Sequence, residues 1–173
     1  MVRLAAFCLF SLTFLACTGQ EKGEQKDNSW SNKESIEFNQ VSSKQEIRII
    51  EKYGERRGWK LKNTGSGAHY WIYDSLPGNF PQEGDLLYLN MVVTLLSGDT
   101  CYNTANYGME EVKVGKDQSE AGLHEVLPFI PIGSKAKIVL PSYLAFGVAG
   151  DQNKIPPMST VIYDVQVFDS KQK

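Results

Sequence analysis

The 173-residue chain has a globular composition, with 42% hydrophobic and 22% charged residues, and its formal net charge is −2. This charge argues against a basic nucleic-acid-binding surface, and no internal segment has the 18 or so apolar residues that a membrane span needs. The length suits one ordinary domain with a short extension.

The first residues predict a secreted protein that carries lipid. Arg3 precedes an apolar run from Leu4 to Ala16, which is too short for a spanning helix but suits the core of a signal peptide. The run ends in Leu15-Ala16-Cys17, which resembles the lipobox of bacterial lipoproteins. We therefore expect a signal peptide over residues 1–16 and lipid on the Cys17 thiol. The lipid would anchor the protein in the cell envelope, at the outer membrane facing the periplasm. The alternative is a plain secretory signal whose cleavage leaves an incidental cysteine.

The segment after the signal predicts a tether rather than a folded unit. Residues 17–34 are polar and charged, with almost nothing to bury, which is typical of a flexible linker. With Cys8 in the signal and Cys17 acylated, Cys101 is left alone, so no intramolecular disulfide is expected. No metal-ligand spacing or phosphate-binding loop appears, so we expect neither a metal nor a cofactor.

A helical extension is expected over residues 35–60. Ser43 and Glu46 fit a capping box, and Gly54 is a plausible helix stop. Between them, three apolar residues spaced three apart form one helical face: Ile47, Ile50 and Tyr53. This pattern predicts a helix over about residues 44–53.

From Trp59 the apolar period changes to two, which predicts a sheet. A hairpin is expected around residues 63–67, and residues 86–95 give the strongest strand signal, with a turn at 97–99. A short strand is expected at 110–115, and the last two strands at 135–141 and 159–168. The inward face of the strongest strand consists of Leu87, Leu89, Met91, Val93 and Leu95.

A short helix is expected across one face of this sheet. It carries inward-facing Leu123, Val126 and Leu127 and ends near Leu127, because Pro128 removes an intrahelical hydrogen bond. We expect five or six strands, paired antiparallel because most links are too short for parallel crossovers. The fold class is α+β, a half-barrel.

The stretch from Tyr143 to Val165 combines a flexible glycine loop with aromatic residues. It contains Phe146-Gly147, Gly150 and Ile155-Pro156-Pro157, followed by a strand-like run. The stretch carries no cluster of His, Cys or carboxylate residues, so acid–base chemistry is not expected there. It is typical of the rim and wall of an apolar pocket.

From about residue 65 to 168 the chain resembles the FKBP-type peptidyl-prolyl cis-trans isomerase family. The resemblance rests on Phe146-Gly147-x-x-Gly150, Ile155-Pro156-Pro157-x-Ser159-Thr160 and the run 161–165. The lipid anchor and N-terminal helix resemble a lipoprotein subgroup with gliding-motility-associated members. The resemblance implies an FKBP-like curved antiparallel sheet wrapped on a short helix, with an isomerase domain at 61–170.

The resemblance also implies an active site. The catalytic residues would be Phe146, Tyr163, Ile155, Leu123, Met91 and Tyr102, and the substrate-binding residues Cys101 and the backbone N–H of Glu120. The family prefers Tyr at the position of Met91, Phe at Cys101, Asp at Tyr102 and Trp at Leu123. These departures predict an attenuated activity.

Rotation about a peptide bond breaks no covalent bond, so such a site needs no nucleophile and no general base. A dry apolar pocket favours the twisted amide over the planar, well-solvated one. The resemblance therefore implies a monomeric, lipid-anchored isomerase that acts on proline-containing polypeptide segments and assists the folding of envelope proteins. One alternative is a catalytically weak or inactive module that binds a peptide or protein within an envelope complex. Another is a purely structural lipoprotein subunit.

Overall fold

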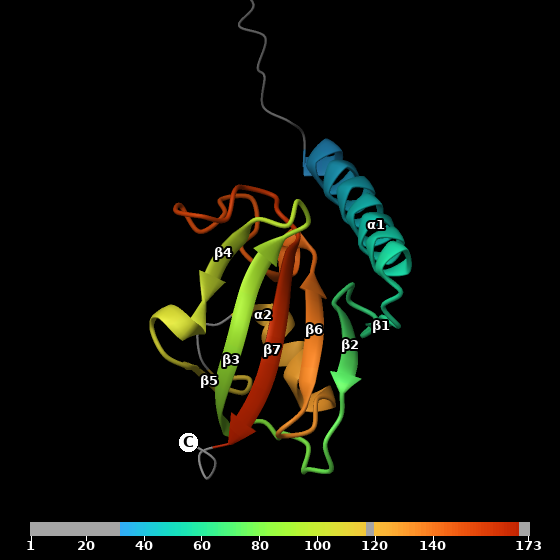
Figure 1. Cartoon of the computed structure of the whole chain (residues 1–173). Helices are drawn as coiled ribbons and strands as arrows, with labels where there is room; N and C mark the ends of the chain where they lie inside the picture. Colours follow the sequence, from blue (N-terminus) through green and yellow to red (C-terminus); the bar gives the residue numbers. More distant parts are fainter. Residues whose placement is uncertain (1–31, 117–119, 170–173) are drawn as a thin grey trace, which may run out of the picture.

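The computed structural model describes residues 32–116 and 120–169 (Figure 1). The expected signal peptide, Cys17 and nearly all of the expected tether lie outside the described residues. No helix among the described residues is long and apolar enough to cross a membrane. The elements in chain order are α1 (Asn32–Arg57), β1 (Lys62–Asn63), β2 (His69–Asp74), β3 (Leu86–Leu95), β4 (Thr100–Asn103), η1 (Thr104–Asn106), β5 (Glu110–Lys113), α2 (Ala121–Val126), η2 (Leu127–Phe129), β6 (Lys135–Leu140), η3 (Ser142–Leu144) and β7 (Val161–Asp169).

The strands form one antiparallel sheet in the order β1-β2-β6-β7-β3-β4, and β5 also pairs with β3. The central pair runs in register from Leu87 opposite Asp169 to Leu95 opposite Val161. The antiparallel pairing predicted from the short links is confirmed. The described residues form seven strands rather than five or six, because a two-residue strand, β1, completes the hairpin with β2.

The main core lies between the sheet and α2, which Figure 1 shows behind β3, β7 and β6. The alternation predicted for β3 is confirmed, because Leu87, Leu89, Met91 and Val93 are all buried in this core. A Cβ on Gly122 would clash with the side chain of Leu140. Glycine at that position therefore lets α2 approach β6 closely. The helix ends at Val126, one residue before the end predicted near Leu127, and a 3-10 turn that contains Pro128 follows it.

A smaller core on the other face of the sheet holds α1. Ile50 and Tyr53 of α1 are buried there against Val139 of β6 and Ile162 of β7. Val139 and Ile162 neighbour one another across the two strands, and their sequence neighbours point into the main core. The N-terminal helix therefore docks on its own domain, which the sequence alone did not decide.

The helix α1 is longer than predicted at both ends. Ser43 is not an N-cap, since it lies inside the helix, where its hydroxyl donates to the carbonyl of Asn39 at 2.7 Å. Residues with capping chemistry also occur within helices, so the Ser43–Glu46 spacing was misleading. The helix begins at Asn32, inside the segment expected to be a tether.

Gly54 does not end the helix either. A Cβ at Gly54 would clash with the side chain of Leu61, so this glycine makes room for the chain that returns along α1. The helix ends at Arg57, followed by Gly58 at φ 69°. Gly58 holds the left-handed conformation that commonly terminates a helix.

Candidate active site

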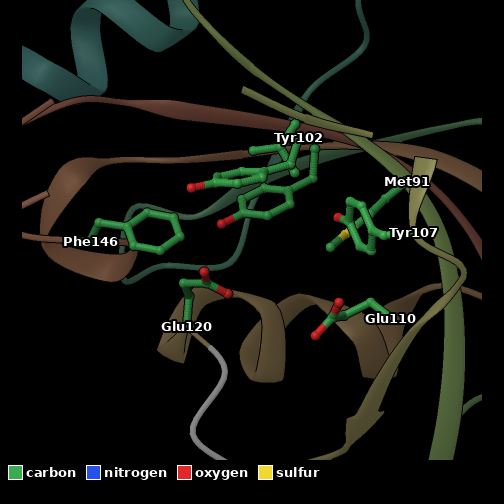
Figure 2. Close-up of a pocket in the computed structure, with 8 residues that line it drawn as sticks. Met91, Tyr102, Tyr107, Glu110, Glu120 and Phe146 are labelled. Atoms are coloured by element: carbon green, nitrogen blue, oxygen red, sulfur yellow. The ribbon is translucent and has the colours of Figure 1, made fainter. Parts of the chain in front are cut away.

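A pocket of about 410 Å³ lies between the sheet, the start of α2 and the loop that precedes β7 (Figure 2). Its lining combines aromatic, aliphatic and acidic side chains: Met91, Val93, Tyr102, Tyr107, Glu110, Glu120, Phe146 and Tyr163. The pocket thus brings together five residues proposed from the sequence, namely Met91, Tyr102, Glu120, Phe146 and Tyr163.

Cys101, Leu123 and Ile155 do not line the pocket, although the resemblance placed them there. Their side chains are 4%, 2% and 2% exposed and belong to the main core, which also contains the lining residues Met91, Val93 and Tyr163. The thiol of Cys101 donates to the carbonyl oxygen of Lys154 at 3.5 Å, which ties β4 to the loop.

Val93, Tyr107 and Glu110 line the pocket but were not proposed from the sequence. Val93 was predictable, because it lies two residues beyond Met91 and alternation puts both on one face of β3. Tyr107 and Glu110 flank a turn with Gly108 at φ 98°. Nothing in the residue pattern signals which way such a turn directs its side chains.

The loop between η3 and β7, residues 145–160, forms a flap at the rim of the pocket. Backbone hydrogen bonds hold this loop in place. The Gly147 N–H donates to the carbonyl oxygen of Ser142 at 2.8 Å, and the Met158 N–H donates to the carbonyl oxygen of Gly147 at 2.9 Å. Gly150, at φ 65°, approaches the backbone of Ile155 so closely that a Cβ would clash with it.

Asp151 organises the centre of this flap. One oxygen of its carboxylate accepts the backbone N–H groups of Asn153 at 2.9 Å and Ile155 at 2.7 Å, and the other accepts the hydroxyl of Tyr102. Burial alone would raise the pKa of Asp151, but these hydrogen bonds outweigh it and hold the pKa below the ordinary value. Tyr102 therefore belongs both to the pocket wall and to the anchor of the flap.

Glu120 and Tyr163 make the pocket wall partly polar. Glu120 is half-buried at the start of α2, and its burial raises the pKa of its carboxyl group, with the charge of Glu110 adding to the shift. Tyr163 is 1% exposed, and its hydroxyl lies near the Glu120 carboxylate without a hydrogen bond of good geometry to any described residue. Burial raises the pKa of Tyr163 well above its ordinary value, and the nearby Glu120 charge adds to this. The sequence led us to expect that no titrating group acts in the reaction, and the carboxylates of Glu110 and Glu120 nevertheless line the pocket.

Within residues 32–116 and 120–169, no group of three or more His, Cys, Asp or Glu side chains is placed to hold a metal ion. What the pocket offers is a set of aromatic rings, a few aliphatic side chains and an acidic edge. Such a site can bind an apolar ring and one neighbouring polar group without covalent chemistry.

A family model described as FKBP-type peptidyl-prolyl cis-trans isomerase matches residues 78–168, more than half of the chain. The chain belongs to this family. The matched range contains every residue that lines the pocket. The FKBP resemblance drawn from the glycine and proline pattern is therefore confirmed, while the lipoprotein subgroup stays a prediction.

Two curated relatives illustrate the family relationship. FkpA of Escherichia coli K12, an FKBP-type peptidyl-prolyl cis-trans isomerase, is 33% identical over 121 residues. That alignment covers 70% of this chain and 43% of FkpA, so the chain spans less than half of that relative. FK506-binding protein 1 of Kluyveromyces lactis is 30% identical over 91 residues, which cover 52% of this chain and 80% of that protein.

Solved structures agree with the FKBP-like fold. FkpA from Escherichia coli superposes with a TM-score of 0.60 and 26% identity, covering 82% of this chain and 73% of that one. A peptidyl-prolyl cis-trans isomerase from Pseudomonas syringae superposes with a TM-score of 0.63 and 19% identity, covering 75% of this chain and 92% of that one. The second likeness supports the fold alone.

Proposed function

We propose that this protein is a lipid-anchored peptidyl-prolyl cis-trans isomerase that assists the folding of envelope proteins. The observation that carries the proposal is the aromatic pocket of about 410 Å³, which lies wholly within the region matched to the FKBP family. Its substrates would be proline-containing polypeptide segments.

The pocket has the properties that this reaction requires. The barrier to peptide-bond rotation is about 18–20 kcal/mol, and an X–Pro bond isomerises between cis and trans in roughly tens to hundreds of seconds without catalysis. The twisted amide is less polar than the planar one, so a wall of low polarity favours it. Met91, Val93 and the ring of Phe146 supply such a wall for a proline ring.

The location in the envelope rests on the N-terminal sequence. The apolar run up to Ala16 and the lipobox-like Leu15-Ala16-Cys17 support cleavage before Cys17 and lipid attachment there. We place the protein at the outer membrane facing the periplasm, as a monomer of the lipoprotein subgroup that includes gliding-motility-associated members. In this proposal the lipid on Cys17 attaches the protein to the membrane.

The acidic edge of the pocket favours a second function. Glu110 and Glu120 make the wall less apolar than a cradle for a twisted amide should be. A pocket of this kind could hold a proline segment tightly and turn it over slowly. The second candidate is therefore a catalytically weak or inactive binding module of an envelope complex.

The two functions are separated by the isomerisation rate of a short Leu-Pro peptide, followed by NMR exchange between its cis and trans signals. The proposed enzyme accelerates the exchange, and Phe146→Ala lowers the acceleration, because it removes a ring from the pocket wall. Phe80→Ala is the matched control, since Phe80 is 53% exposed and does not line the pocket. Binding of the peptide without any acceleration would establish the module instead.

A further inference from the structure

One edge of the pocket carries two acidic side chains. Glu110 comes from β5 and Glu120 from the residue before α2, and Figure 2 shows both on the side of the pocket opposite Tyr102. None of the described lining residues is basic. Glu120 is half-buried and Glu110 is exposed at the rim. Their like charges repel one another, so a bound cation would relieve an unfavourable interaction.

A buried polar atom points to the same kind of ligand. The Tyr163 side chain is 1% exposed and lines the pocket, and its hydroxyl lies near the Glu120 carboxylate without a hydrogen bond of good geometry to any described residue. A buried hydroxyl that is poorly paired is destabilising, and phenylalanine would fill the same space without this penalty. A ligand that brings N–H donors into the pocket would give the hydroxyl oxygen a partner.

The remaining walls also suit a cation on an apolar stem. Tyr102, Tyr107 and Phe146 present aromatic rings to the pocket. The Lys154 ammonium already lies 5.3 Å from the centre of the Tyr102 ring, on the flap side, so this ring interacts with a cation within the protein itself. Lysine and arginine side chains combine an apolar stem with a charged head that carries several donors.

We propose that this pocket selects proline segments in which the residue before the proline is lysine or arginine. The side chain of that residue branches from the backbone next to the X–Pro bond that rotates, so it begins at the pocket when the proline is bound there. Its stem would pass along the aromatic rings, and its head would reach Glu110, Glu120 and the Tyr163 hydroxyl. This inference rests on the proposed function, because it assumes that the proline itself binds in this pocket.

The test uses the full chain and three peptides that differ only in the residue before proline: lysine, acetyl-lysine and glutamate. Acetyl-lysine keeps the aliphatic stem of lysine and removes its charge by adding an acetyl group to the nitrogen. Dissociation constants come from calorimetry, and isomerisation rates from NMR exchange. We expect the lysine peptide to bind about three- to tenfold more tightly than the acetyl-lysine peptide, with glutamate the weakest. The preference should shrink between about 0.05 and 0.5 M salt, because salt screens partly exposed charges.

The variants Glu120→Gln and Glu110→Gln should each reduce the lysine-to-acetyl-lysine ratio, and the double variant should bring it close to one. Glu111→Gln is the matched control, since Glu111 neighbours Glu110 on β5, is exposed and does not line the pocket. Tyr163→Phe removes only the hydroxyl and should also reduce the ratio. The salt series on the unmodified chain tests the electrostatic contribution to the lysine preference independently of any variant.

Equal affinity for lysine and acetyl-lysine peptides would overturn the inference, and so would a preference that survives the double variant. If every peptide is isomerised at the same rate and bound equally, the inference fails while the proposed function stands. If none is isomerised but the lysine peptide binds best and the variants abolish this, the enzymatic function fails while the recognition stands.

Discussion

Glu46 and Ser142 are joined by two hydrogen bonds although they lie 96 positions apart in the sequence. The Ser142 N–H donates to one oxygen of the Glu46 carboxylate at 2.7 Å, and the Ser142 hydroxyl donates to the other at 2.9 Å. The hydroxyl of Thr160 donates to the first oxygen as well, at 2.7 Å. Ser142 precedes the flap and Thr160 is its last residue, so one carboxylate on α1 fixes both ends of the flap.

We expect Glu46→Gln to lower the free energy of unfolding by about 1–3 kcal/mol, because an amide cannot accept all three hydrogen bonds and leaves partly buried donors unpaired. Urea-induced unfolding measures the loss. Glu51→Gln is the control, since Glu51 lies on the same helix but is exposed, and it should change stability by less than about 0.5 kcal/mol. Equal effects of the two substitutions would show that Glu46 contributes only its charge.

Asp151→Ala should loosen the flap without unfolding the domain. The substitution removes the acceptor of the Asn153 and Ile155 N–H groups, so these amides should exchange with deuterium about tenfold faster or more. Amide exchange measured by NMR checks this. Asp99→Ala, in the exposed turn between β3 and β4, is the control and should leave the flap amides unchanged. Unaltered exchange in Asp151→Ala would mean that the backbone hydrogen bonds of the flap suffice.

Stability should depend on pH through Glu120. Burial raises the pKa of its carboxyl above the ordinary value of 4.5, and the Glu110 charge adds to this, while its own backbone, Tyr163 and His124 oppose it. A raised pKa in the folded state means that the protonated form favours folding. The contribution of protonated Glu120 to the free energy of unfolding is fully present below about pH 4.5, and it is lost as the pH rises through the raised pKa.

Glutamine at position 120 does not ionise, so Glu120→Gln does not lose this stability as the pH rises. The variant should be more stable than the unmodified chain at pH 7, and the difference should vanish near pH 4. Denaturant unfolding across that range measures it. Glu111→Gln serves as the control because Glu111 is exposed. A difference that is constant with pH would show that Glu120 titrates normally.

Leu123→Trp should destabilise the domain. The resemblance placed Leu123 at the pocket floor, but its side chain is 2% exposed and surrounded by the main core, so an indole must displace its neighbours. Overpacking of this kind costs about 1–3 kcal/mol. Thermal unfolding compares it with Leu76→Trp, at a leucine that is 48% exposed. Matching midpoints would mean that the space beneath the pocket is larger than the core packing indicates.

Cys17→Ser should abolish lipid attachment. The lipid is attached to the cysteine thiol, so the variant should lose its acyl chains and no longer partition with membrane lipoproteins into a detergent phase. Mass spectrometry of the mature N-terminus checks the modification directly. Cys8→Ser is the control, since Cys8 lies within the expected signal peptide and should not affect lipidation. Unacylated protein in the unmodified strain would overturn the lipid anchor.

The sheet was predictable because its signals are local. Alternation along β3 marks its buried face, and the short links require antiparallel pairs. The bounds of α1 were not predictable, because Ser43 and Gly54 have the chemistry of helix ends but lie inside the helix. The residues of the pocket also fall into a group that was predictable and a group that was not. Tyr163 and Phe146 follow from the family pattern, whereas Glu110 reaches the wall through the path of one turn.

The length of α1 has a mechanical consequence. Its 26 residues make a rod about 39 Å long, at about 1.5 Å per residue. The part from Glu46 onward is held against the domain by hydrogen bonds and by the smaller core, while Ile36 and Val41 are 56% and 65% exposed. In Figure 1 the start of the rod and the flap lie toward the same end of the sheet. A rigid lever attached in this way transmits orientation as well as position. Any surface that bound the start of this rod would therefore meet the domain with the pocket rim in a fixed direction.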